Sequence, residues 1–270
     1  MQSRAVTSLL ILLLAAFALP AGASGSTVQA EQPLRIAVAA NFRLTLERLV
    51  AAFTEHAASE IVVSSGASGL LYGQIVQGAP FDLFFSADAE RPRRLEAAGL
   101  IVPGSRFVYA IGQLALWQPG RSLDGTVEDA LRQPSARTLA IANPATAPYG
   151  LAAVQVLDRL GLAAQSPFRI VRGESLGQTF QFVASGNADL GFIALSQLIE
   201  FEALNGRSVR TEALLVDPSL HEPIVQEAVW LARARDNATA REFLKFVQGP
   251  GRTIVAEAGY LLPGLSDGSR

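Results

Sequence analysis

The chain has 270 residues, half of them hydrophobic, and a formal net charge of −2 at pH 7. This length allows two domains of ordinary size with substantial cores, and the charge gives no reason to expect a nucleic-acid partner. Cysteine is absent, which excludes disulfides, thiolate metal sites and a lipidated cysteine anchor.

The N-terminus has the composition of a secretory signal peptide. Arg4 supplies the positive n-region, and residues 5–19 form a short apolar h-region. Small residues before Ala23 fit a cleavage site, and Ala30 marks a second candidate. We predict a signal peptide over residues 1–23, with an alternative end at 30, and a periplasmic location. The alternative is a transmembrane anchor, but the apolar run is shorter than the roughly 20 residues of a span.

Short apolar runs and helical patterns alternate through the first part of the mature chain. Strands are predicted at residues 34–39, 60–64 and 81–86, with helices at about 42–53, 68–77 and 89–98. Asn41 and Ser68 stand at N-cap positions, while Gly78 and Gly99 end helices. A β-rich stretch at 107–117 then interrupts the alternation, and we expect the chain to cross into a second domain there.

The same alternation returns further along the chain. Strands are predicted at 138–142, 168–171 and 190–195, and helices at 150–160 and 175–185. A β-rich return at 210–215 and 224–231 should carry the chain back. The segment 238–258 has helical spacing, broken at Gly249-Pro250, and should dock on the first domain. We therefore predict an α/β fold with one lobe from residues 31–110 plus 228–264 and a second lobe from 111–227. The alternative is one larger α/β domain.

A strand, a tight turn of small or polar residues and a helix start occur together four times. The turns are Ala39-Ala40-Asn41-Phe42, Gly66-Ala67-Ser68-Gly69, Ala147-Pro148-Tyr149-Gly150 and Glu174-Ser175-Leu176-Gly177. Each should present unpaired backbone N–H groups at the positive end of a helix dipole, where an anion can bind. No turn carries a nucleophile–base pair or a metal cluster, so we expect capture of a small oxyanion and no enzymatic activity.

Other polar residues carry no assigned role. His56 and His221 lie far apart in the sequence without metal-like partners, and we predict that both are surface residues. Arg91-Pro92-Arg93-Arg94 is a small basic cluster that should form a solvated helix face. Contact of this cluster with a transporter is the alternative.

Several motifs, in the same order along the chain, resemble those of the periplasmic molybdate-binding proteins of ABC transporters. They are Ala37-Val38-Ala39-Ala40-Asn41-Phe42, Ser64-Ser65-Gly66-Ala67-Ser68-Gly69, residues 78–88, Asn143-Pro144, Ala147-Pro148-Tyr149-Gly150 and residues 186–192. The resemblance covers about residues 34–264. It implies a two-lobed type II periplasmic binding fold, in which each lobe is a mixed, mostly parallel sheet flanked by helices. The ligand cleft would lie between the lobes.

The resemblance also implies the site residues and the partners. The oxyanion, molybdate or tungstate, would be held through its oxygens by Asn41, Ser68, Tyr149 and Leu176, with Ser175 beside Leu176. These groups would act without Lys or Arg, without direct cation ligands and without a cofactor. The protein would be a monomer that delivers its ligand to an ABC permease in the inner membrane.

This sequence departs from the family pattern at two places that bear on selectivity. Many members carry Ser where this chain has Asn41, and some carry a strand Tyr where it has Ala194. In terms of the resemblance, Tyr149 is the candidate for the role of that strand Tyr.

Alternative interpretations of the same residues stay open. Asn41, Ser68 and Ser175 could be simple helix caps, Tyr149 a surface loop aromatic and Leu176 an ordinary apolar residue. The ligand could also be sulfate, thiosulfate or another small anion. An enzyme or a solute-sensing module on the same fold is a further alternative.

Overall fold

The computed structural model describes residues 33–55, 60–132, 136–163 and 167–264. The predicted signal peptide and His56 lie outside these residues. None of the helices in the described ranges is both long and apolar enough to cross a membrane.

The first lobe is built on a five-stranded sheet with the order β2-β1-β3-β10-β4. Its strands are β1 (Leu34–Ala39), β2 (Ile61–Gly66), β3 (Leu83–Ser86), β4 (Phe107–Gly112) and β10 (Ile224–Trp230). β1 pairs in parallel with β2 and β3, whereas β10 is antiparallel to β3 and β4. The sheet is therefore mixed, and β10 is its one reversed strand.

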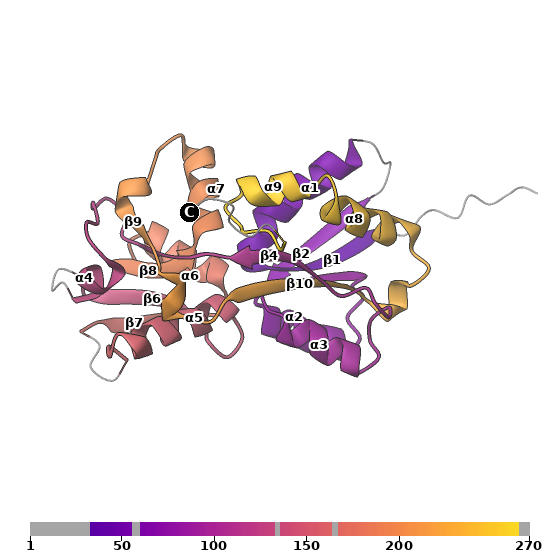
Figure 1. Ribbon diagram of the computed structural model, residues 1–270, viewed down its shortest axis with the longest axis horizontal. Coiled ribbons are helices and arrows are strands. Elements are labelled where there is room, and N and C mark those ends of the chain that lie inside the picture. Colours follow the sequence, from indigo (N-terminus) through magenta and orange to yellow (C-terminus); the bar gives the residue numbers. More distant parts are fainter. Residues whose placement is uncertain (1–32, 56–59, 133–135, 164–166, 265–270) are drawn as a thin grey trace, which may run out of the picture. The chain divides into compact units, whose positions relative to one another are not determined.

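Helices cover both faces of this sheet, as Figure 1 shows. On one face lie α1 (Arg43–Thr54), α8 (Ala238–Gln248) and α9 (Arg252–Glu257), and on the other α2 (Ser68–Val76) and α3 (Glu90–Ala97). Gly78 and Gly99 follow α2 and α3 with φ of 86° and 69°, as expected of glycines that end helices. The predicted docking of the C-terminal segment on the first lobe is confirmed, since Phe243 and Val247 belong to its core.

The second lobe has the sheet order β7-β6-β8-β5-β9. Its strands are β5 (Leu114–Trp117), β6 (Thr138–Ala142), β7 (Arg169–Gly173), β8 (Leu190–Ala194) and β9 (Ala213–Leu215). β6 is parallel to β7 and β8, while β5 is antiparallel to β8 and β9. The pattern of the first sheet therefore recurs, and the predicted α/β fold of two mixed, mostly parallel sheets is confirmed.

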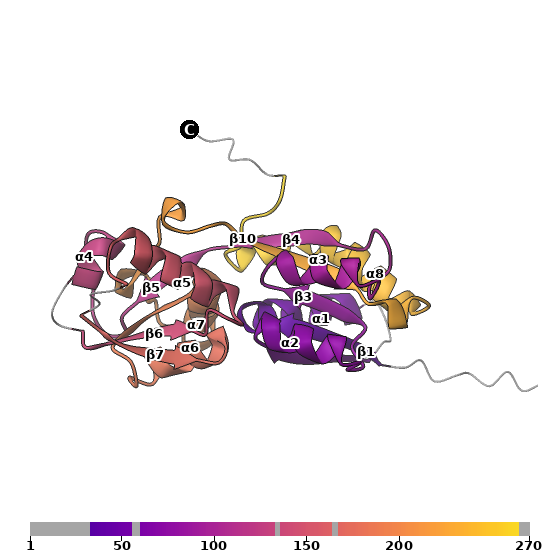
Figure 2. The same ribbon diagram turned by 90° about the horizontal axis from the view of Figure 1, so that it is seen from below.

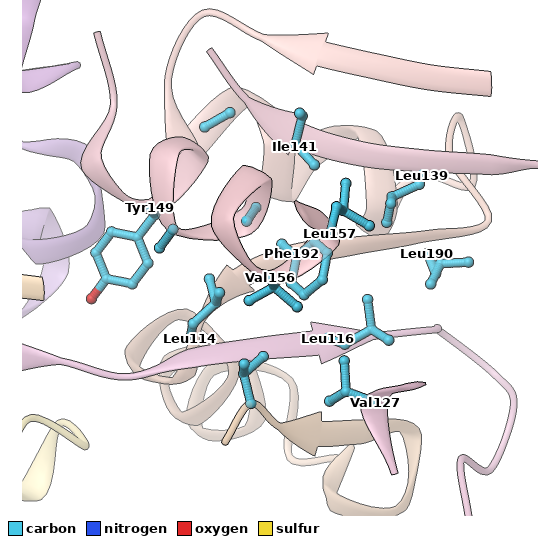
Figure 3. Packing of buried hydrophobic residues seen from close by; sticks show 14 of the residues in the cluster. Leu114, Leu116, Val127, Leu139, Ile141, Tyr149, Val156, Leu157, Leu190 and Phe192 are labelled. Carbon is cyan, nitrogen blue, oxygen red and sulfur yellow. The ribbon is translucent and has the colours of Figure 1, made fainter. Parts of the chain in front are cut away.

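Two hydrophobic clusters pack the faces of the second sheet. On one face, α4 (Val127–Arg132) and α5 (Pro148–Arg159) bury Val127, Val156 and Leu157 against Leu116 and Phe192, as Figure 3 shows. On the other face, α6 (Leu176–Ala184) and α7 (Leu195–Asn205) pack around the indole of Trp117. Burial of apolar surface of this extent is the main stabilising contribution to each lobe.

The chain passes between the two sheets twice. The predicted β-rich stretch 107–117 divides into β4 in one sheet and β5 in the other. The return passes through β9 and the 3₁₀ turn Pro218–Leu220 into β10, which lies beside β4 in Figure 2. β10 pairs with the first sheet from Ile224 onward. The lobe boundaries 31–110 plus 228–264 and 111–227 remain a prediction, and the boundary before residue 228 falls inside β10.

Some local predictions differ from the structure. Helices α4 and α7 lie outside the predicted elements, and Arg210–Glu212 is a 3₁₀ turn before β9 and no strand. His221 is buried, with 6% of its surface exposed, and its Nδ1 lies 2.7 Å from the carbonyl oxygen of Glu222. The prediction that His221 is a surface residue is therefore wrong.

Candidate functional site

Asn41 lies in the 3₁₀ turn Ala40–Phe42, which joins β1 to α1, and its side chain is buried. The prediction that Asn41 caps the first helix is wrong, because Phe42 is the N-cap of α1 and no side chain caps it. Asn41 Nδ2 donates to Oε1 of Gln226 at 2.8 Å and to the hydroxyl of Tyr260 at 3.1 Å. The Asn41 carbonyl accepts from Tyr260 at 2.7 Å and from Ser196 Oγ at 3.2 Å. Tertiary contacts therefore orient the residue.

Ser68 is the first residue of α2, and the N-cap is Ala67, so the predicted capping role is wrong. The buried Ser68 Oγ accepts a hydrogen bond from the N–H of Ala87 at 2.9 Å. A serine hydroxyl also carries one donor hydrogen. Within the described residues no acceptor for that hydrogen is found. The hydroxyl is therefore anchored by its oxygen while its hydrogen stays available to a ligand.

Tyr149 is the second residue of α5. The helix begins at Pro148, and the first helical position is the one where proline is most favoured. Its side chain is 1% exposed, so the alternative of a surface loop aromatic is wrong. Figure 3 shows the hydroxyl pointing away from the hydrophobic cluster. This hydroxyl accepts from Nε2 of Gln226 at 3.2 Å. Burial raises the pKa of Tyr149 well above its usual value, and the hydroxyl therefore stays neutral.

The backbone at the start of α5 packs directly against the backbone at the end of β6. A Cβ on Gly150 would lie 2.2 Å from the carbonyl oxygen of Ala142, the last residue of β6. Only glycine leaves room for the helix to start so close to the strand. The sequence motif around Tyr149 therefore has a steric reason as well as a polar one.

Ser175 is the N-cap of α6, and its Oγ accepts from the N–H of Gln178 at 3.2 Å, so its interpretation as a helix cap is confirmed. Oε1 of Gln178 accepts from the N–H of Glu174, the residue before the N-cap, at 2.7 Å. Leu176, the first residue of the helix, is buried. Its N–H is thereby held at a fixed helix terminus.

Three of the predicted contact residues share one backbone feature. The N–H groups of Ser68, Tyr149 and Leu176 lie in the first turns of α2, α5 and α6. Among the described residues, none of the three donates a hydrogen bond. First-turn N–H groups have no partner inside their helix and carry the positive end of its dipole. They are therefore available to an anion.

The sheet registers bring these helix starts close to one another in pairs. In the first sheet the last residues of β1 and β2, Ala39 and Gly66, are register partners. In the second sheet Ala142 and Gly173 are paired in the same way at the ends of β6 and β7. Helices that leave neighbouring parallel strands must therefore start side by side, at the edge where ligands bind in α/β folds.

Contacts between the lobes bring the two pairs together. The N–H of Gly69 in α2 donates to the carbonyl of Thr146, before α5, at 2.9 Å. A Cβ placed on Gly177 would lie 3.6 Å from the Cβ of Ala40, so the start of α6 adjoins the turn that holds Asn41. The structure thus brings all four predicted turns into one neighbourhood.

Two grooves flank this neighbourhood, and residues of both lobes line each of them. One groove is lined by Ala87, Asp88, Pro148 and Leu151, among others. The second is lined by Ala40 and Arg43 from the first lobe and by Gly177 and Gln197 from the second. Neither groove has Asn41, Ser68, Tyr149 or Leu176 among its lining residues, although their chain neighbours Ala40, Pro148 and Gly177 are among them.

Cationic charge near the site is limited. In the described part of the chain, the buried polar and charged side chains include no Lys or Arg. Two arginines adjoin these turns. Arg43, the first residue of α1, lines the second groove and pairs with Glu47. Arg91 of α3 pairs with Asp88, and its Nη2 donates to the carbonyl of Ala145 at 3.1 Å. The side chain is 18% exposed, so the prediction of a solvated face is wrong for Arg91, although Arg94 in the same cluster is 60% exposed. Its partner Asp88 offsets the charge of Arg91.

The described residues contain no group of three or more His, Asp or Glu that could hold a metal ion. The chemistry that this neighbourhood offers is therefore that of hydrogen-bond donors, supplied by main-chain N–H groups and one serine hydroxyl. Such a donor set is complementary to an anion that accepts hydrogen bonds through several oxygens.

The model of the bacterial extracellular solute-binding protein family matches residues 34–261. The chain belongs to this family. It is 42% identical to the molybdate-binding protein ModA of Azotobacter vinelandii, over 90% of this chain and 95% of that protein. It is 39% identical to the molybdate-binding protein ModA of Rhodobacter capsulatus, over 83% and 86% of the two chains.

Solved structures of other solute-binding proteins share the fold. The structure of the periplasmic molybdate-binding protein of Azotobacter vinelandii matches with a TM-score of 0.79 at 42% identity, over 85% of this chain and 99% of that one. The sulfate-binding protein SubI from Mycobacterium tuberculosis matches with a TM-score of 0.69 at 15% identity, over 87% and 88%. At that identity the second likeness concerns the fold alone.

Sequence reasoning missed the side chains that hold the predicted contacts in place. Gln226, Tyr109, Tyr260 and Ser196 are all buried, and all belong to the hydrogen-bond network of Asn41. Gln226 leaves one signal in the sequence, since it and Glu227 form a polar pair between apolar residues of β10. For Tyr260, which follows Gly259 near the end of the chain, no sequence signal points to the site.

Proposed function

We propose that this solute-binding protein captures molybdate or tungstate between its two lobes and delivers it to the permease of an ABC importer. Asn41, Ser68, Tyr149 and Leu176 are the proposed contacts, with Ser175 fixing the N–H of Leu176. The observation that carries the proposal is the set of N–H groups at the starts of α2, α5 and α6 that have no acceptor in the described part of the chain. The relatives named molybdate-binding proteins support the choice of ligand.

The energetics of such a site are adequate without a cationic side chain. Charge-assisted hydrogen bonds contribute about 1.5–3 kcal/mol each, and micromolar to nanomolar binding corresponds to about 8–12 kcal/mol. The three N–H groups and the serine hydroxyl described above would contribute about 6–12 kcal/mol in gross terms, which is comparable with that requirement before desolvation and closure of the lobes are counted. Main-chain amides at helix starts also need no reorganisation, since the fold already orients them.

A donor-only site also selects among anions. Hydrogen phosphate carries an O–H, which would face other N–H groups and lose a hydrogen bond. Molybdate, tungstate and sulfate present only acceptor oxygens, so the size of the cavity must discriminate among them. Binding would need no enzymatic step and no cofactor.

The remaining parts of the proposal concern location and assembly. We propose that residues 1–23 direct export to the periplasm, where the protein acts as a monomer and meets a permease in the inner membrane. The name of a matched structure, the periplasmic molybdate-binding protein of Azotobacter vinelandii, supports this location.

Titration calorimetry with molybdate, tungstate, sulfate and phosphate tests the proposal. The purified protein should bind molybdate and tungstate tightly, sulfate weakly and phosphate not measurably. Tight binding of sulfate without binding of molybdate would contradict the proposed ligand. Absence of binding for all four anions would contradict the proposed site.

A further inference from the structure

Gln226 occupies an irregular position in the strand that returns the chain to the first lobe. In the pairing of β10 with β4, Gln226 is the register partner of Ala110 while Glu227 is the partner of Val108. Tyr109 is therefore an additional residue on β4, as in a β-bulge. Bulges are found next to functional sites, where they re-aim side chains. Here the Tyr109 hydroxyl donates to Oε1 of Gln226 at 2.9 Å.

The carboxamide of Gln226 joins contact residues of both lobes. Oε1 accepts from Nδ2 of Asn41 at 2.8 Å, and Nε2 donates to the hydroxyl of Tyr149 at 3.2 Å. Asn41 follows β1 of the first sheet, whereas Tyr149 belongs to α5, which packs on the second sheet. Gln226 is fully buried, so these two hydrogen bonds and the one from Tyr109 are shielded from water.

Gly112 makes room for this bridge. A Cβ on Gly112 would lie 2.1 Å from the hydroxyl oxygen of Tyr149 and 2.7 Å from Nε2 of Gln226. Gly112 is the last residue of β4, at the point where the chain crosses to the second lobe. Its φ is not in the left-handed region, so the need for glycine comes from space alone. Gly112 on β4 and Gln226 on β10 thus both favour the hydrogen bond between Gln226 and Tyr149.

We propose that Gln226 is a positioning residue, which couples the contact residue Asn41 in the first lobe to the contact residue Tyr149 in the second. The inference rests on the proposed function and names a residue that controls the same site. Relative movement of the lobes stretches the bond between Nε2 of Gln226 and the Tyr149 hydroxyl. The bond therefore forms in the arrangement that also brings the N–H of Tyr149 toward the first lobe, and it favours retention of bound ligand.

A double-mutant cycle on molybdate binding tests this coupling. Gln226→Met keeps the length of the side chain and removes its hydrogen bonds, and Tyr149→Phe removes only the hydroxyl. Each variant should weaken binding by about tenfold, mainly through faster release of the ligand. The double variant should be no weaker than Gln226→Met, because both changes break the same bridge.

Gln248→Met is the matched control. Gln248 is the last residue of α8 in the first lobe, it is exposed, and it is not among the lining residues of either groove. This control makes the same chemical change away from the network of Asn41, and its affinity for molybdate should equal that of the wild type.

The outcomes separate this inference from the proposed function. Tight binding by the wild type with unchanged affinity in Gln226→Met would overturn the positioning role alone, and so would single-variant losses that multiply in the double variant. If Gln226→Met does not fold, an unchanged dissociation rate in Tyr149→Phe overturns the role by itself. A wild-type protein that binds no oxyanion would overturn both.

Discussion

Glu200 provides a quantitative test of the contact between the lobes. It lies in α7, only 8% of its surface is exposed, and its Oε1 accepts from Oγ1 of Thr45 in α1 at 3.0 Å. Burial raises the pKa of Glu200 to about 7; the Thr45 hydrogen bond and the charges of Arg43 and Arg48 only partly oppose that rise. The proposed perturbation is Glu200→Gln, which keeps the acceptor oxygen and removes the charge.

The sign follows from the pKa of the folded and unfolded chains. In the unfolded chain Glu200 has a pKa near 4.5, against about 7 when folded. Below the lower value both states hold the proton, and the charge has no cost. As pH rises between the two values, the folded state keeps a proton that the unfolded state has released, so stability falls. Above about pH 7 the full cost is present, and the difference in pKa converts to about 3 kcal/mol.

The amide of Glu200→Gln does not titrate and so escapes this cost. The variant should therefore be more stable than the wild type by up to about 3 kcal/mol near pH 8, and about equal to it near pH 4.5. Urea denaturation at both pH values, with the free energy of unfolding extrapolated to water, measures the difference.

Glu128→Gln is the control, because Glu128 forms an exposed pair with Arg132 and its side chain is 47% exposed. Its effect on stability should be small at both pH values. Equal effects of Glu200→Gln near pH 4.5 and pH 8 would refute the reasoning, since a protonation-linked cost must be small at the unfolded pKa and full above the folded pKa.

The remaining predictions concern the proposed site. Ser68→Ala removes a hydroxyl donor and Asn41→Ala breaks the bridge to Gln226, so each should weaken molybdate binding by about 1–3 kcal/mol in calorimetry. Unchanged affinity in both would leave them structural residues. Gly69→Ala puts a Cβ 3.0 Å from Cα of Thr146, at the contact between the lobes. The variant should bind molybdate more weakly, while its circular dichroism spectrum stays that of the wild type. Wild-type affinity would argue that the contact between Gly69 and Thr146 does not matter for binding. Gly150→Ala puts a Cβ 2.2 Å from a carbonyl oxygen and should lower the free energy of unfolding by about 1–3 kcal/mol, visible as a lower melting temperature; an unchanged melt would show that the turn can relax.

Much of the fold is determined by local sequence. Apolar runs such as residues 34–39 and 138–142 specify buried strands, and Gly78 and Gly99 end helices because glycine adopts positive φ without strain. The helix cap at Ser175 is also determined locally, because the donor Gln178 lies only three residues after the acceptor Ser175. Periodicity and turn chemistry act over a few residues, so a single sequence reveals them.

The tertiary structure alone decided what Asn41 and Ser68 do. Both have the residue type of a helix cap, yet their side chains bond to Gln226 and Ala87, which are remote in the sequence. The local sequence pattern cannot show these hydrogen bonds, because their partners come near Asn41 and Ser68 only when the chain has folded.

The split of residues 107–117 between two sheets has the same origin. The stretch has one continuous β-like composition, but β4 pairs with β10 and β5 pairs with β8 and β9. A strand belongs to the sheet whose partners are within hydrogen-bonding reach, and those partners come from distant parts of the chain. The sequence by itself thus determined which segments become strands and helix starts, while long-range pairing decided which of them meet at the site.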